Sequence, residues 1–236
     1  MADLEGVNLM PYDRKFFYDN VRASLFRGTL TQSQVDGMNY LLAVWEWGFE
    51  ANNPNDGTMW LAYCLATTYH ETAQTMQPIE EYGRGQGKSY GQPTGPYNQC
   101  YYGRGHVQLT WDTNYQTGQT NLKNRYDVDA NIYPEASNML DPQTSALILY
   151  DGMVYGWFTG VGLPKYLSKS KGIEDPVNAR RIVNGTDCAQ QIAGYYWSFK
   201  AALKQVPAET VEATGGLPSL PDLPKGPHMP KPPDAA

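Results

Sequence analysis

The sequence predicts a mainly α fold, a helical domain with a short loop or hairpin lobe beside a cleft, followed by a Pro-rich C-terminal tail. Apolar residues recur at helical spacing in several segments, glycine and proline crowd residues 78–106, and prolines recur every third residue near the C-terminus. A chain of 236 residues suits one compact domain with additions. We therefore expect an N-terminal extension over residues 1–29, the helical domain over 30–205 and the tail over 206–236.

Two helices are predicted in the first third of the chain. Thr31 and Gln34 form a capping-box pattern ahead of residues that share one helical face, namely Val35, Met38, Leu42 and Trp45. Residues 58–73 are apolar nearly all round, as expected for a helix in the centre of a domain. Glu71 lies on the last turn of this second helix.

Three further helices are predicted after residue 140. Asp141 and Pro142 supply a cap and a first-turn proline for a helix that reaches Trp157. Asp175 and Pro176 supply the same cap and proline for a shorter helix. That shorter helix ends at Asn184 and Gly185. A last helix starts near Asp187 and carries Ile192, Tyr195, Tyr196, Phe199 and Leu203 on one face.

Acidic residues near the predicted cleft indicate a chemistry. Glu71 is followed ten residues later by Glu81, with Glu80 beside it in glycine-rich sequence. One protonated carboxyl group and one carboxylate are the minimum equipment for cleaving a glycosidic bond. The negative end of the helix dipole and aromatic neighbours disfavour a charged Glu71, as a general acid requires. Adjacent side chains rarely point the same way, so we expect only one of Glu80 and Glu81 to face Glu71.

Other interpretations of the same residues are weaker. Glu71 could be a solvated residue of a last helical turn. Residues 83–89 imitate a phosphate loop, but Tyr82 stands where that motif needs glycine. The chain has only three histidines, His70, His106 and His228, without zinc-ligand spacing, and neither Cys64 nor Cys100 has the surroundings of a nucleophile. We predict no metal and no cofactor.

Composition limits the partners. A net charge of −6 argues against nucleic acid, and no 18-residue apolar run suggests a membrane span. Three cysteines without metal spacing are expected to be reduced thiols. The N-terminal residues contain no secretion signal, so we expect the chain to fold in a host cytoplasm and to reach a cell wall by holin-type release or as a particle component.

An ordered set of motifs resembles family 19 glycoside hydrolases, the chitinase-like group that includes many phage endolysins. The motifs are residues 70–72, 77–83, 102–110, 114–115 and 181–185, and the resemblance covers roughly residues 30–204. It implies a lysozyme-like helical fold and an inverting mechanism. Unlike plant members, this chain lacks the disulfide cysteines, and its loop between the two acids is organised differently.

The resemblance also implies roles for single residues. Glu71 would protonate the glycosidic oxygen and Glu81, by position, would hold the attacking water, with Glu80 as the alternative and Ser89 or Thr94 as helpers. The residues expected to bind substrate are His70, Tyr102, Gln108, Asn114, Tyr115, Arg181 and Asn184. Plain structural roles remain open for several of them: Gln108 could bond backbone at a strand end, Asn114 and Asn184 could cap turns, and Arg181 could cover the core.

Three functions follow in order of preference. The first is an endo-acting muralytic glycosidase that cleaves the β-1,4 bonds of peptidoglycan. The second is a chitinase acting on β-1,4-N-acetylglucosamine polymers. The third is a non-catalytic glycan-binding or structural virion subunit, suggested by the tail, whose prolines from Pro218 to Pro230 would line one edge of a polyproline helix. Such a strip could dock a protein partner or be a semi-rigid disordered tail.

Overall fold

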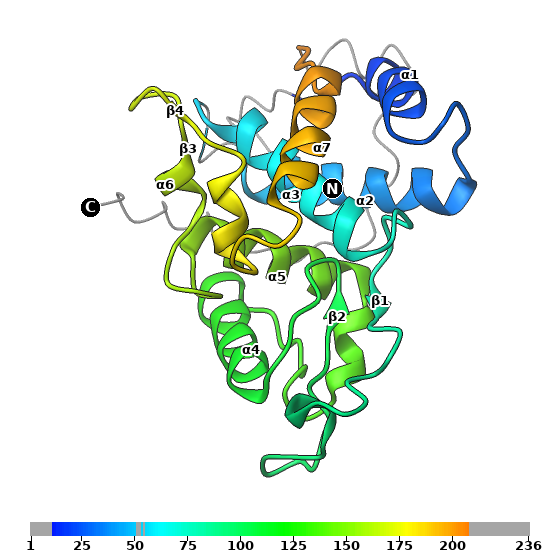
Figure 1. Ribbon diagram of the computed structural model, residues 1–236. Helices are drawn as coiled ribbons and strands as arrows, with labels where there is room; N and C mark the ends of the chain where they lie inside the picture. The colour runs from blue at the N-terminus through cyan, green and yellow to red at the C-terminus, as the bar shows by residue number, and fades with distance from the viewer. Residues whose placement is uncertain (1–10, 51–52, 54, 208–236) are drawn as a thin grey trace.

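A single helix, α3 (Gly57–Glu71), organises the structure (Figure 1). The computed structural model describes residues 11–50, 53 and 55–207. Of the 15 residues of α3, 12 are buried, and only Thr58, His70 and Glu71 are partly exposed. This pattern confirms the predicted central helix, and it leaves Glu71 at the point where the helix emerges from the core.

Three predicted helices pack around α3 and confirm the mainly α prediction. They are α2 (Gln32–Gly48), α5 (Pro142–Tyr155) and α7 (Ala189–Ala202). Helix α2 begins with both hydrogen bonds of the predicted capping box between Thr31 and Gln34. Helix α5 is capped by Asp141, but Gly156 ends it in a left-handed conformation, so Trp157 lies beyond the helix.

The described part of the predicted N-terminal extension belongs to the same core. Helix α1 (Arg14–Ser24) packs on α7 and buries Phe17 and Val21 completely. The two ends of the described region also meet, since the Val206 N–H donates to the Pro11 carbonyl at 2.9 Å. The rest of the predicted tail, residues 208–236, lies outside the described residues, as do residues 1–10.

Helix α4 (Asp112–Tyr126) was not predicted because its sequence is mostly polar. A buried carboxylate attaches it to α5. Asp151 of α5 accepts hydrogen bonds from Arg125 and Tyr126 of α4 and from the Trp157 indole. The helix is therefore held by this polar contact together with its buried residues Tyr115, Leu122 and Tyr126.

Two short hairpins complete the fold. Strand β1 (Ile79–Glu80) pairs antiparallel with β2 (Arg104–Gly105), and β3 (Leu167–Ser168) pairs with β4 (Ile173–Glu174). Between β1 and β2 the chain forms a long loop with one 3-10 turn, η1 (Ser89–Gly91), which confirms the predicted loop or hairpin lobe. The remaining elements are η2 (Ala136–Leu140), α6 (Leu163–Tyr166) and η3 (Asn178–Ile182).

The elements form an upper and a lower part. Figure 1 shows α1, α2, α3 and α7 above, α4 and the β1–β2 hairpin below, and α5 between them. The short helix predicted after Asp175 and Pro176 is η3, a 3-10 turn rather than an α-helix. None of the helices in the described ranges is long and apolar enough to cross a membrane.

A buried carboxylate also joins the two ends of the domain. Glu50 accepts hydrogen bonds from the hydroxyl of Tyr12 at 2.9 Å, from the Trp45 indole and from the Gln205 amide. Burial raises the pKa of Glu50, so these donors are needed to stabilise its charged form. The cluster therefore holds the chain just before α1, the end of α2 and the chain beyond α7 together.

We predict that Tyr12→Phe lowers the free energy of unfolding by about 2 kcal/mol, because a charged acceptor in the core loses a donor. Urea denaturation measures this change. Tyr97→Phe is the matched control, because the Tyr97 side chain is 48% exposed to water. Equal stability of the two variants would contradict a stabilising role for the Glu50 cluster.

Candidate active site

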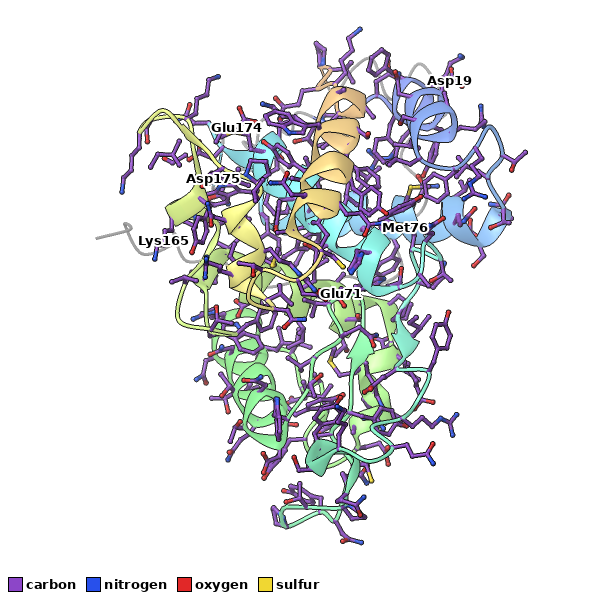
Figure 2. All side chains as sticks on the ribbon, in the orientation of Figure 1. Asp19, Glu71, Met76, Lys165, Glu174 and Asp175 are labelled. Atoms are coloured by element: carbon purple, nitrogen blue, oxygen red, sulfur yellow. The ribbon has the colours of Figure 1, made fainter. Side chains whose placement is uncertain are left out.

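One cleft of about 520 Å³ brings the predicted acids together. Glu71 enters it from the end of α3, and Glu80 and Glu81 enter it from the end of β1 and the residue that follows. Figure 2 shows Glu71 at the lower end of α3, where the upper and lower parts of the molecule meet. Both Glu80 and Glu81 line the cleft, and which of the two faces Glu71 stays a prediction.

Glu71 is held by a buried cation. The Arg180 guanidinium donates to Glu71 Oε1 at 2.6 Å, and its Nε donates to the Asp187 carbonyl at 3.0 Å. Arg180 is 2% exposed, whereas the side chain of Glu71 is 16% exposed. The sequence interpretation did not anticipate this ion pair. Among the described residues, no donor contacts the second oxygen of Glu71.

The arginine predicted near the acids was off by one position. Arg181 is exposed, does not line the cleft, and directs its Nε toward Asn178 at 3.4 Å. In the 3-10 turn η3 successive side chains point in different directions, so Arg180 faces inward and Arg181 outward. The choice of Arg181 came from the family resemblance, and the adjacent Arg180 was the available alternative.

Glu80 is fixed by three donors. The Tyr102 hydroxyl donates to Oε1 at 2.6 Å, Arg104 Nε donates to the same oxygen at 3.3 Å, and Arg84 contacts Oε2 at 2.9 Å. The Tyr102 hydrogen bond, with the two arginines, holds the pKa of Glu80 below its ordinary value. Glu80 is therefore a charge-compensated carboxylate and a weak proton acceptor.

Glu81 has fewer and longer contacts. The Gly103 N–H donates to its Oε2 at 3.2 Å, and the Tyr90 hydroxyl donates to its Oε1 at 3.3 Å. Both distances are longer than typical hydrogen bonds of their kinds. No cation contacts Glu81 within the described residues, so its lone pairs are the more available ones.

Two predicted substrate contacts lie beneath the cleft instead of lining it. Tyr115 is completely buried, and its hydroxyl donates to the Tyr102 carbonyl at 3.0 Å. Tyr102 is 8% exposed, and its ring lies 3.6 Å from the Arg104 guanidinium. Neither is among the residues that line the cleft. Together with Arg104 they form a support that fixes Glu80.

The remaining predicted contacts line the cleft, namely His70, Gln108, Asn114 and Asn184. Gln108 also has the structural role left open above, because its amide donates to the carbonyls of Ile79 and Gly105 at 3.0 Å. Asn114 similarly donates to the Thr110 carbonyl at 2.9 Å. Ser89 and Thr94, suggested as helpers for the water, do not line the cleft.

The sequence interpretation missed most of the aromatic lining. Tyr82, Tyr90, Trp111 and Phe158 all line the cleft, and Tyr82 and Trp111 are among the most exposed large side chains that the structure describes. Tyr82 and Tyr90 lie in the long loop, and Trp111 precedes the unpredicted helix α4. Exposed rings beside carboxylates suit a ligand with apolar faces and polar edges.

The described residues contain no group of three or more His, Cys, Asp or Glu side chains arranged to hold a metal ion. The acids of the cleft are instead paired with arginines and hydroxyl groups.

The sequence matches no protein-family model and no curated protein. Among solved structures, the chain is similar to a bacterial family 19 chitinase, with 18% identity and a TM-score of 0.48 over 83% of this chain and 96% of that one. It is also similar to chitinase C from Streptomyces griseus HUT6037, with 19% identity and a TM-score of 0.42 over 94% and 100% of the two chains. A mutant of chitinase C gives 18% identity and a TM-score of 0.44 over 84% and 94%.

We predict that Arg180→Ala lowers the free energy of unfolding by about 3 kcal/mol, because it leaves the Glu71 carboxylate in a partly buried site without its partner. Arg181→Ala is the matched control and should change stability by less than about 0.5 kcal/mol, since its side chain is exposed. Chemical denaturation of the two variants side by side measures the difference. A larger effect at Arg181 would overturn the assignment of Arg180 as the partner of Glu71.

Proposed function

We propose that the cleft hydrolyses β-1,4 glycosidic bonds within an N-acetylated glycan strand, by an endo-acting and inverting two-carboxylate mechanism. The observation that carries the proposal is the presence of Glu71 and Glu81 in one aromatic-lined cleft, in different electrostatic surroundings. Pairs of carboxyl groups with different surroundings are how one site supplies both an acid and a base.

Glu71 is the general acid in this proposal. Arg180 occupies Oε1, which leaves Oε2 to carry the proton toward the glycosidic oxygen. When the proton leaves, the Arg180 guanidinium stabilises the carboxylate that forms. The proton thus moves from Oε2 to the leaving oxygen, which departs as a neutral hydroxyl.

Glu81 is the general base. It accepts only two long hydrogen bonds, so it can take a proton from the attacking water. Glu80 is a poorer candidate because Tyr102, Arg104 and Arg84 already occupy its oxygens. Its role in the proposal is to hold the hairpin lobe in register, with β1 against β2.

The polymer is proposed to be peptidoglycan, with chitin as the alternative, and the enzyme would then act at a cell wall. Both polymers contain β-1,4-linked N-acetylhexosamines, so the same acids serve either one. The side chains of His70, Asn114 and Asn184 on the cleft wall supply polar groups for such sugars.

The deciding experiment is mass spectrometry of products released in oxygen-18 water from purified peptidoglycan and, separately, from chitin oligomers. The wild-type protein should release fragments with one heavy oxygen, and Glu71→Gln should lower turnover at least about a hundredfold while its circular dichroism spectrum is unchanged. The polymer that yields fragments is the substrate. No fragments from either polymer would refute the hydrolase and favour a non-catalytic glycan-binding or structural subunit.

The two neighbouring glutamates give a second prediction. Glu81→Gln should lower kcat at least about a hundredfold with little change in melting temperature, because only its proton acceptance is lost. Glu80→Gln should lower the melting temperature instead, because two arginines lose their charged partner. Reversal of this pattern would make Glu80 the base.

A further inference from the structure

Trp111, at the wall of the cleft, is unusual in its exposure and in its backbone conformation. Its side chain is 48% exposed and lines the cleft, and its backbone has φ 78. Residues other than glycine rarely adopt such a positive φ, and a bulky aromatic side chain there is a clear outlier. The outlier calls for an explanation in packing or in function.

Helix capping does not explain this tryptophan. Trp111 is the N-cap residue of α4, a position that favours Ser, Thr, Asp or Asn, and it makes no side-chain capping bond. Its backbone is fixed from both sides, because its N–H donates to the Tyr101 carbonyl at 2.9 Å and its carbonyl accepts from Asn114 and Tyr115 at 3.1 Å. Glycine would satisfy the same backbone with less strain.

Core packing does not explain it either. The close ring partner of Trp111 is Tyr90, with ring centroids 5.2 Å apart and planes at 81°. This edge-to-face contact orients the indole and still leaves about half of it in solvent. The Tyr90 hydroxyl in turn donates to Glu81 Oε1, so one tyrosine touches both the exposed indole and the proposed base.

The backbone places Trp111 close to the reacting groups. Arg104 pairs with Glu80 on one side and with Leu109 on the other. Two strand spacings, about 10 Å, therefore separate the backbones of Glu80 and Leu109, and Trp111 follows Leu109 by two residues. A ligand that reaches the acids can also cover the indole.

We propose that Trp111, oriented by Tyr90, is a stacking subsite for one pyranose ring of the bound glycan. The inference rests on the proposed function and adds to it a residue that binds substrate next to the base. The C–H face of a pyranose ring covers the exposed indole face and removes apolar surface from water. Tyr90 couples this binding to Glu81, so an occupied subsite holds the base in place.

The test measures binding separately from hydrolysis. Each variant is made in a Glu71→Gln background, and binding of the N-acetylglucosamine hexamer and of peptide-free peptidoglycan strands is followed by calorimetry. Trp111→Ala should weaken binding of the better probe about tenfold, the loss expected when an aromatic contact surface is removed. Trp197→Ala is the matched control, because Trp197 of α7 is 49% exposed and does not line the cleft.

A second variant separates binding from folding. Trp111→Gly should weaken binding as Trp111→Ala does, while its melting temperature stays equal or rises, because glycine fits the positive φ. Unchanged binding by both variants, or no binding of either probe by the parent, would overturn the subsite. A fall of more than about 5 °C in the melting temperature of both variants would assign Trp111 to folding and also overturn it.

The outcome is independent of the proposed hydrolysis. If the wild-type protein cleaves neither polymer but Trp111→Ala weakens binding, the subsite stands and the catalytic proposal fails. If the wild-type protein cleaves a polymer and Trp111→Ala binds like its parent, the catalytic proposal stands and the subsite fails.

Discussion

The burial of α3 is the constraint on which the rest of the structure depends. A helix that is apolar nearly all round must be covered on every side, and α2, α5 and α7 provide that cover. The covering stops at the last turn, where His70 and Glu71 reach the cleft. The position of Glu71 is therefore set by the packing of the whole helical core. A side chain fixed in this way holds its position without support from the loop that it faces.

The three acidic residues of the cleft differ in the partners that compensate their negative charge. Glu71 has one buried arginine, Glu80 has two arginines and a tyrosine, and Glu81 has only long hydrogen bonds from a backbone amide and a tyrosine. The arginines are therefore unevenly distributed, and Glu81 is the one of the three that no cation contacts among the described residues.

The sequence predicted the helices whose apolar faces or capping signals stand out, namely α2, α3, α5 and α7. It missed α1, although Asp13 caps that helix and Phe17 and Val21 are buried on it. It also missed α4, whose few buried residues lie among polar ones and whose contact with Asp151 is distant in sequence. The cleft shows the same limit of local signals. Glu71 follows from its helix, whereas the choice of Arg180 over Arg181 depends on a 3-10 turn whose phase the residues alone do not reveal.

The two sides of the cleft are consequently held by different forces. Glu71 lies on a helix fixed by apolar packing, whereas Glu81 lies in a lobe fixed by hydrogen bonds among Tyr102, Arg104 and Tyr115 and by the Gln108 amide. Apolar packing tolerates small changes of shape, but a hydrogen-bond network requires every partner. The lobe also contains the strained residues Gln108 and Trp111, whose positive φ values persist only because neighbouring contacts impose them. The Gln108 amide itself holds the lobe together, so folding accounts for that residue, whereas no capping bond and little burial account for Trp111.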